Sequence, residues 1–212
     1  MEGELAVAKN SSNLLNDELK KHTTSARRAV TNLERECYRN AQYSQYETLE
    51  VSKIPLSIPD SEVEPVVTKI VNALLPKGCA LLEPEDIQAC HRRQGKYTRE
   101  TVLLKLIWRG DVREVLNKRK LLRDMNLSTI DPRLTSPVYI NEHLTAYYSK
   151  LRYACKQLKS AKLLDSFWIS GHKVKAKLVP DGEINIISHK EDLSDLLPET
   201  DLRPYFSKIK NF

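Results

Sequence analysis

Residues 85–108 read EDIQACHRRQGKYTRETVLLKLIW and predict two strands joined by a polar turn. The first strand covers residues 85–91, and the second covers residues 101–108, which are rich in Val, Leu and Ile. The turn between them contains Gly95, which allows the chain to reverse sharply. The stretch therefore predicts a β-hairpin with a strongly basic tip.

The sequence around this hairpin predicts two helices and two further strands. Residues 47–55 (ETLEVSKIP) alternate like a strand, and the apolar residues of 63–75 recur with helical spacing. We expect Asp111 to cap a helix over residues 112–125. The predicted buried face of that helix consists of Val115, Leu116, Leu121 and Leu122. A strand at 138–140 completes the order β-α-β-β-α-β, the split βαβ arrangement that the RNA-recognition module (RRM) also uses. Residues 46–144 are therefore predicted to form an RRM-like domain. Proteins of many unrelated functions share this order of elements.

A second α+β pattern begins after Leu144. Residues 145–164 predict a helix, and a short closing helix is expected at 189–197. Three strands lie between these helices, at 166–170, 173–179 and 183–188, separated by tight turns. Residues 145–197 are predicted to form a small C-terminal α+β domain that packs on the first domain, because so few residues bury little surface alone. Residues 198–212 are expected to be a tail.

The N-terminal segment, residues 1–45, is predicted to be one long helix, because it contains no Pro and no Gly after Gly3. A heptad pattern places a thin apolar seam along the helix. The seam consists of Leu5, Ala8, Ser12, Leu15, Leu19, His22, Ala26, Ala29 and Leu33. It can hold a weak homo-oligomer as a coiled coil; the alternative is a lone helix packed on the domain behind it. The expected fold class is thus α+β, with a helix, an RRM-like domain and a small C-terminal domain.

The composition argues against a membrane, disulfide or metal protein. The longest apolar runs, such as TVLLKLIW, are much shorter than the roughly 18–20 residues of a membrane span. The start MEGELAVAKN lacks the pattern of a signal peptide, so we expect an intracellular protein, cytoplasmic or nuclear. Cys37, Cys79, Cys90 and Cys155 form no CxxC pair, which predicts reduced thiols and no metal or other cofactor.

The net charge of +6 is concentrated in one central block. Residues 87–179 carry twenty Lys and Arg against seven Asp and Glu, whereas residues 47–86 and 180–212 are acidic. Because ordinary surfaces intersperse the two signs, such a block favours a polyanionic partner.

Several stretches together resemble two related groups of proteins. They are LERECYRNAQYSQYETLEVSKIP, the hairpin EDIQACHRRQGKYTRETVLLKLIWR, REVLNKRKLL, VYINEHLTAYYSKLRYACKQLK, and FWISGHKVKAK followed by GEINIISHKEDL. In this order, over roughly residues 30–197, they resemble the baculovirus few polyhedra (FP) proteins and the first-open-reading-frame protein of LINE-type retrotransposons. The resemblance implies a coiled coil, a non-standard RRM fold and a C-terminal domain that together bind single-stranded nucleic acid and act as its chaperone.

The hairpin tip and the second helix carry the first candidate contacts. At the tip, phosphate contacts are predicted for Arg92, Arg93, Lys96 and Arg99, and base stacking for Tyr97. Around the helix, phosphate contacts are predicted for Arg109, Arg113, Lys118, Arg119, Lys120 and Arg123. The alternative for both groups is an ordinary solvated surface. No RNP1-like motif is present, and Leu49, Val51, Leu104 and Leu106 are expected to occupy much of the sheet, so readout on the sheet face is not expected. Trp108 can be a core residue or a stacking platform.

The C-terminal domain carries the second set of candidates. Its first helix interleaves cations with tyrosines, which is typical of a groove for single strands. Predicted contacts there are Tyr148, Lys150, Arg152, Lys156 and Lys159. Lys173, Lys175 and Lys177 alternate along one strand and should point to one side, which makes them the best candidates for phosphate contacts. Asn141 and Glu142 are expected to fix the junction between the two domains.

The sequence contains no motif of a hydrolase, a P-loop NTPase, a zinc protease or a dinucleotide-binding enzyme. We therefore expect a non-enzyme that binds single-stranded RNA or DNA with little sequence preference. The rival hypothesis is a structural or adaptor protein of the FP type that acts through coiled-coil and protein contacts.

Overall fold

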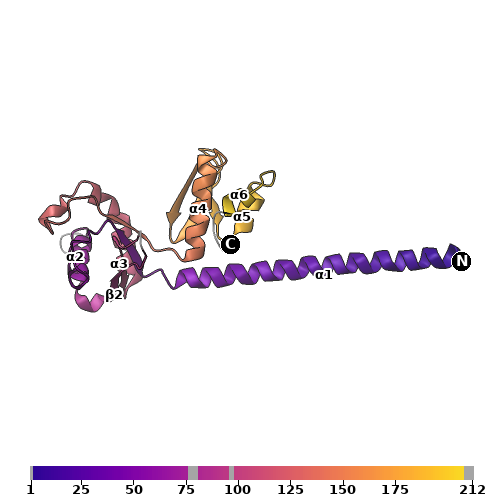
Figure 1. Cartoon of the computed structure of the whole chain (residues 1–212), viewed down its shortest axis with the longest axis horizontal. Coiled ribbons are helices and arrows are strands. Elements are labelled where there is room, and N and C mark those ends of the chain that lie inside the picture. The colour runs from indigo at the N-terminus through magenta and orange to yellow at the C-terminus, as the bar shows by residue number, and fades with distance from the viewer. Residues whose placement is uncertain (1, 76–80, 96–97, 208–212) are drawn as a thin grey trace. The chain divides into compact units, whose positions relative to one another are not determined.

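The protein is described by a computed structural model, which covers residues 2–75, 81–95 and 98–207 (Figure 1). The chain divides into two compact units, residues 1–40 and residues 41–212. The helix α1 (Glu2–Tyr43) is unbroken over 42 residues, as expected from a segment without Pro and without Gly after Gly3. At 1.5 Å per residue it is about 63 Å long.

The second unit begins with a four-stranded antiparallel sheet. Its strands are β1 (Thr48–Ser52), β2 (Ile87–Arg92), β3 (Thr101–Leu106) and β4 (Tyr139–Glu142), in the order β2-β3-β1-β4. The chain thus places its first and third strands side by side in the middle of the sheet, with the hairpin partner β2 at one edge. The predicted alternation of elements is confirmed for this segment.

Two helices cover one face of this sheet. They are α2 (Asp60–Asn72) and α3 (Arg109–Lys118), and the core between them and the sheet includes Leu49, Val51, Leu104 and Leu106, all fully buried. These four side chains therefore lie on the helix-covered face of the sheet, so their presence does not argue against base readout on the open face, as the sequence-based prediction had assumed. Period-2 alternation fixes which residues share a face, but it does not say which face the helices cover.

The second helix differs from its prediction in three respects. Its N-cap is Trp108, and Asp111 lies inside the first turn. The α-helix ends at Lys118 and continues as the 3₁₀ helix η2 (Arg119–Arg123), so the residues near its end no longer follow a 3.6-residue period. As a result Leu122 is buried, whereas Leu121 is 52% exposed. Two further 3₁₀ helices, η1 (Pro84–Asp86) and η3 (Leu127–Thr129), lie in the connections.

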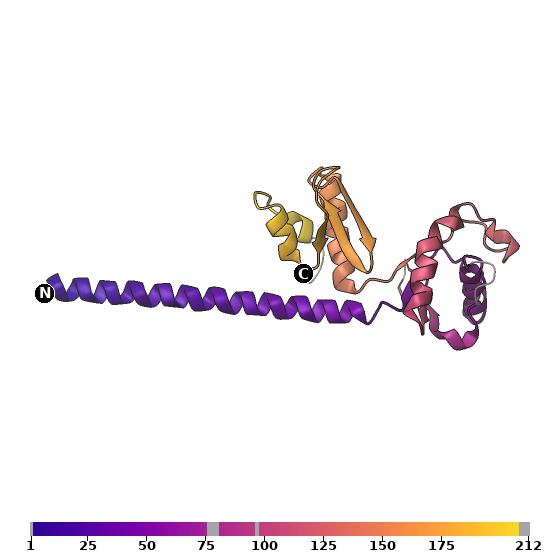
Figure 2. The same cartoon turned by 180° about the vertical axis from the view of Figure 1, so that it is seen from behind.

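The rest of the second unit is a helix on a small sheet. The helix α4 (Ala146–Ser160) lies against an antiparallel sheet in the order β5-β6-β7 (Figure 2). The strands are β5 (Ser166–Ser170), β6 (Lys173–Lys177) and β7 (Asn185–Ile187), and α5 (Lys190–Leu196) and α6 (Arg203–Ser207) follow them. Leu151, Ala154 and Leu158 of α4 are fully buried against this sheet. The predicted boundaries at 45, 144 and 197 stay predictions, since residues 41–212 form one compact unit.

Candidate nucleic-acid interface

The outer face of the small sheet displays three lysines. Val174 and Ala176 of β6 are fully buried, so Lys173, Lys175 and Lys177 lie on the opposite side of the strand. This alternation confirms the predicted placement of the three side chains on one side. Lys177 Nζ donates a hydrogen bond to the Pro180 carbonyl oxygen over 3.1 Å, and no hydrogen bond or ion pair joins the other two ammonium groups to the described residues.

A tryptophan lies among these lysines. The strand register pairs Trp168 of β5 directly with Lys175 of β6. Side chains directly opposite in an antiparallel pair share a face, with Cβ atoms about 5 Å apart. Trp168, Lys173, Lys175 and Lys177 therefore form one surface, the lysine face. Ile186 of β7 also pairs with Lys175 and borders this surface.

A cavity of about 500 Å³ adjoins the lysine face, and Trp168 also lines it. Its wall carries three guanidinium groups, from Arg93, Arg119 and Arg152. We call this space the central cavity. Residues that line it from the four-stranded sheet and its flanking segments are Glu50, Arg93, Arg119, Asn141, Glu142 and Leu144. Residues that line it from α4 and β5 are Ser149, Arg152, Phe167, Trp168 and Ile169. Cations from both halves of the second unit thus converge on one space beside an aromatic ring.

A buried carboxylate joins the two halves beside this cavity. Glu142, at the end of β4, accepts a hydrogen bond from the backbone N–H of His172, in the turn between β5 and β6. The His172 ring stacks on Tyr46 with ring centroids 4.3 Å apart. Burial lowers the pKa of His172 despite the nearby carboxylate of Glu142. The expectation that Glu142 fixes the junction is confirmed, whereas Asn141 is exposed.

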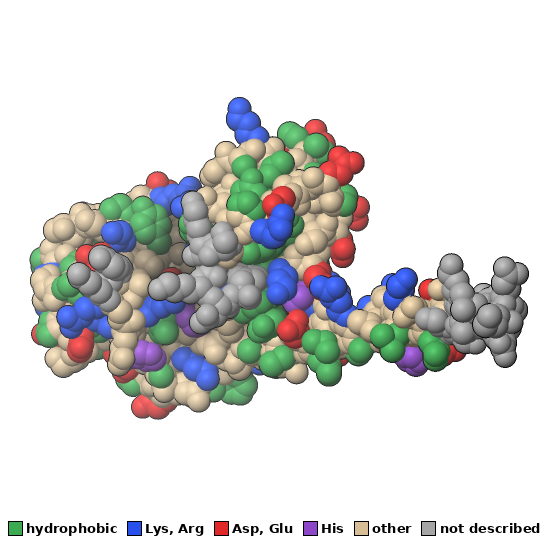
Figure 3. All heavy atoms as spheres, turned by 45° about the vertical axis from the view of Figure 1, so that its right-hand side comes forward, with side chains coloured by type: hydrophobic (Ala, Val, Ile, Leu, Met, Phe, Trp, Pro, Cys, Tyr) green, Lys and Arg blue, Asp and Glu red, His purple; other side chains and the backbone are tan. Residues whose placement is uncertain are grey.

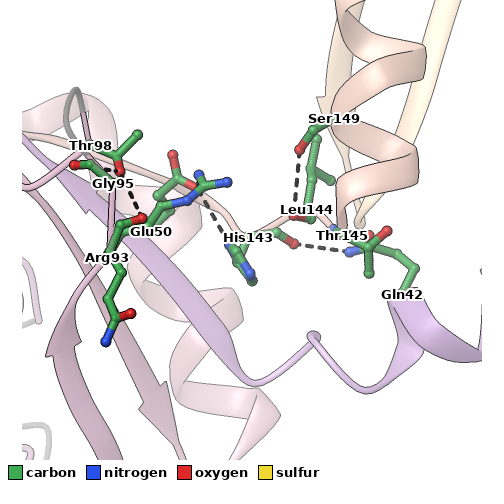
Figure 4. A network of polar contacts seen from close by, with 10 residues as sticks. Gln42, Glu50, Arg93, Gly95, Thr98, His143, Leu144, Thr145 and Ser149 are labelled. Carbon is green, nitrogen blue, oxygen red and sulfur yellow. Dashed lines mark hydrogen bonds and ion pairs between the residues drawn. The ribbon is translucent and has the colours of Figure 1, made fainter. Parts of the chain in front are cut away.

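The connecting segment is also held by Gln42 (Figure 4). Its Nε2 donates to the His143 carbonyl oxygen and its Oε1 accepts from the Thr145 backbone N–H, each over 2.9 Å. The Gln42 side chain is 1% exposed, so it satisfies two backbone groups that water does not reach. The amide therefore fixes the course of the chain between β4 and α4.

One arginine of the hairpin tip, Arg92, stabilises the fold. The guanidinium of Arg92 donates to the carbonyl oxygens of Ile54, Pro55, Ile58 and Arg99, and its side chain is 7% exposed. The prediction of a phosphate contact at Arg92 was therefore wrong, because its donors are already used inside the protein. Arg99 is exposed, and Gly95 has a φ of +142°, as the expected turn requires. The predicted contacts Lys96 and Tyr97 lie outside the described residues.

The cations around α3 divide into paired and exposed groups. Arg109 Nε donates to Glu47 Oε1 over 2.6 Å, and its guanidinium lies 4.0 Å from the Tyr43 ring centroid. Lys118 pairs with Glu114 at 2.7 Å, and Arg119 Nη1 lies 4.0 Å from Glu142 Oε1. The exposed cations are Arg113, Lys120 and Arg123. Trp108 is 64% exposed, so it is not a core residue.

The cations of helix α4 lie at the surface, whereas its predicted stacking residue, Tyr148, is buried. Tyr148 is 4% exposed and belongs to the core, so the prediction that it stacks on bases was wrong. Arg152, Lys156 and Lys159 are exposed, and Lys150 is half-buried. Tyr153, whose ring is 41% exposed, is the tyrosine that this helix offers to solvent. On the face that Figure 3 shows, Lys and Arg side chains are spaced among uncharged and hydrophobic ones.

Sequence reasoning overlooked Trp168, although the signal was present. A turn formed by Gly171 and His172 brings Ser170 opposite Lys173, and this register places Trp168 opposite Lys175. Both turn residues have positive φ, +62° and +58°, which is typical of the tight turns that join two strands in a hairpin. Counting residues outward from this turn gives the register, so the sequence alone could have predicted that Trp168 pairs with Lys175.

Neither the comparison with protein-family models nor that with curated proteins finds a match to this chain. Among the described residues, no cluster of three or more His, Cys, Asp or Glu can hold a metal ion. Burial raises the pKa of the Cys90 and Cys155 thiols to about 12, which keeps both protonated. No helix in the described part of the chain is long and apolar enough to cross a membrane.

Proposed function

We propose that the chain binds single-stranded RNA or DNA with little sequence preference, and that it does so on the lysine face and in the central cavity. The observation that carries the proposal is the register of Trp168 with Lys175, between Lys173 and Lys177. Single strands are held by cations that follow the backbone and by aromatic rings on which bases stack. The lysine face offers both within one pair of strands.

The surrounding fold supports a single strand rather than a duplex as the ligand. Stacking on Trp168 requires an unstacked base, which a duplex does not present. We propose that residues 46–144 are an RRM-like module, which is supported by the element order β-α-β-β-α-β of this segment. Its open face departs from the usual one, because Glu50 occupies the middle of β1 and a carboxylate repels phosphates.

Self-association through α1 would strengthen such binding. Leu15, Leu19 and Leu33 of the predicted seam are 65%, 69% and 66% exposed. A coiled coil of two or more chains would cover these side chains and bring several binding surfaces onto one strand. Together with the resemblance to retrotransposon first-frame proteins, this arrangement favours a nucleic-acid chaperone.

The rival function is that of a structural adaptor of the FP type. The same exposed leucines favour it, because they could pack against the coiled coil of another protein. In that case the basic residues would meet an acidic protein surface. The two functions differ in whether a bare oligonucleotide is bound.

The fluorescence of Trp168 tests the proposal directly. The chain contains two tryptophans, so Trp108→Phe leaves Trp168 as the single emitter. We expect titration with a 20-nucleotide single strand to quench this emission, because a stacked base contacts the indole. The converse variant, Trp168→Phe, should bind more weakly, by roughly tenfold, since one stacked base contributes about 1–3 kcal/mol. Unchanged emission and affinity in both variants would contradict the proposal.

A further inference from the structure

The central cavity contains an anionic group among its cations. Glu50 lies at the middle of β1, and its carboxylate reaches the cavity that Arg93, Arg119 and Arg152 line. The cations of the cavity would be sufficient to bind the phosphates of a nucleic acid. A carboxylate in the same space would oppose phosphates, so its presence calls for a different partner group.

The Glu50 carboxylate is held in place by two neighbours (Figure 4). Arg93 Nη1 and His143 Nδ1 each lie 3.4 Å from Glu50 Oε2. The other oxygen, Oε1, has no hydrogen-bond partner among the described residues. The hydrogen bond with His143 lowers the pKa of Glu50, as does the nearby Arg93, so the group is a carboxylate at neutral pH. A fixed acceptor that is ionised and incompletely used is suited to hydrogen-bond donors of a ligand.

The size and walls of the cavity fit a nucleobase. Its volume of about 500 Å³ lies within the range of about 300–1,000 Å³ that is usual for small-molecule sites. Phe167 and Trp168 line it from β5. Proteins that read an extruded base place it against aromatic side chains and bond its Watson–Crick edge. The arginines at the wall would meet the phosphates on either side of that base.

We propose that the central cavity receives one unpaired base of the bound strand and prefers guanine, with Glu50 as the residue that determines this preference. This inference rests on the proposed function. Guanine carries two adjacent donors on its Watson–Crick edge, N1–H and the N2 amino group, and the unused Oε1 of Glu50 has two lone pairs with which to accept from both. Adenine, cytosine and uracil each present at most one donor group there. The chain would then bind any single strand, but would place guanines in the cavity.

Oligonucleotides that differ only at their two central positions test this inference. The probes are labelled uridine 12-mers in which the two central positions are guanine or adenine, and the readout is fluorescence anisotropy at one salt concentration. We expect the guanine strand to bind the full-length protein about tenfold more tightly than the adenine strand, in line with the roughly 1–3 kcal/mol of a bidentate base contact. In Glu50→Gln the ratio of the two affinities should fall to near one. The single amide oxygen would face Arg93 and His143, as Oε2 does in the wild type, and the amide NH2 group that replaces Oε1 cannot accept from guanine.

A matched control separates this effect from a general change of charge. Glu183 is exposed and outside the cavity, so Glu183→Gln should keep the preference for guanine. Equal affinity of the wild-type protein for the guanine and adenine strands would overturn the inference and leave the proposed function standing. If neither strand binds the wild-type protein, the proposed function itself fails. The wild-type comparison decides whether guanine is preferred even if Glu50→Gln does not fold. Glu50→Asp, which keeps the carboxylate but withdraws it by one methylene, then tests the role of Glu50, and an undiminished preference would contradict it.

Discussion

Glu142 accepts a hydrogen bond from the backbone N–H of His172, and this contact ties the end of β4 to the turn between β5 and β6. Both side chains are less than a tenth exposed. Because the lysine face begins next to His172 and the central cavity includes Glu142, the contact fixes the spacing between the two groups of cations. The junction is therefore part of the proposed binding surface although it carries no free cation of its own.

Removal of this acceptor should loosen the surface without removing its charges. We expect Glu142→Ala to lower the free energy of unfolding by about 1–3 kcal/mol, since it leaves a buried N–H without a partner. Affinity for a single strand should fall, whereas the dependence of the affinity on salt should stay as steep, because every predicted phosphate contact remains. Urea unfolding and anisotropy measure the two effects. Glu183→Ala is the control and should change neither; a shallower salt dependence in Glu142→Ala would contradict this account.

Arg92 should matter for stability rather than for binding. Four carbonyl oxygens from two segments, residues 54–58 and Arg99, accept hydrogen bonds from its guanidinium. We expect Arg92→Ala to cost about 2–4 kcal/mol of unfolding free energy, because buried acceptors lose a charged donor. The neighbouring Arg99→Ala should cost less than about 0.5 kcal/mol, since its side chain is exposed. Urea denaturation distinguishes the two, and equal losses would show that Arg92 does not hold these segments together.

The lowered pKa of Glu50 predicts how stability changes in acid. The hydrogen bond with His143, and then the charge of Arg93, place the folded pKa of Glu50 below the ordinary value of 4.5. Its contribution to stability is thus fully present above about pH 4.5 and is lost as the pH falls through the folded pKa. Wild-type protein should lose more stability than Glu50→Gln between pH 6 and pH 3. Parallel losses in thermal unfolding scans would show that the Glu50 contacts do not form.

The seam of α1 should control the oligomeric state. We expect Leu15→Gln, Leu19→Gln and Leu33→Gln together to abolish self-association, because these exposed apolar side chains would face the partner helix. Sedimentation equilibrium gives the mass of each variant. The control places Gln at Asn13, Lys20 and Arg27, which occupy position b of the same heptad pattern, outside the a/d seam, and it should keep the wild-type mass. A monomeric wild-type protein at micromolar concentration would contradict the prediction.

The sequence was most informative where a short-range pattern alone decides the structure. The alternation of Lys173, Lys175 and Lys177 was predicted because a strand has a period of two. The continuous α1 was predicted because its segment contains no Pro and no Gly after Gly3, the two residues that most destabilise a helix interior. The order of strands and helices in residues 46–144 followed from the same patterns.

The sequence-based predictions failed where tertiary contacts determine the position of a side chain. Composition could not show that Arg92 turns inward to bond four carbonyl groups, since three of these groups lie in a connection 34 to 38 residues earlier in the chain. Likewise Tyr148 belongs to the helical face that packs on the small sheet, although the basic residues Lys150 and Arg152 follow it closely in the sequence. The central cavity combines side chains from β1 to β5, which no local pattern brings together.

The salt dependence of single-strand binding tests the central claim most directly. Each phosphate contact to a single strand contributes about 0.7 to the slope of log affinity against log salt. The account predicts tight binding by the wild-type protein and a slope that is shallower by about 2 after Lys173, Lys175 and Lys177 are all replaced by Ala. A control with Lys20, Lys69 and Arg203 replaced by Ala loses the same charge from α1, α2 and α6 and should keep the wild-type slope. Absence of binding at low salt, or an equal loss of slope in both triple variants, would contradict the claim that the lysine face binds nucleic acid.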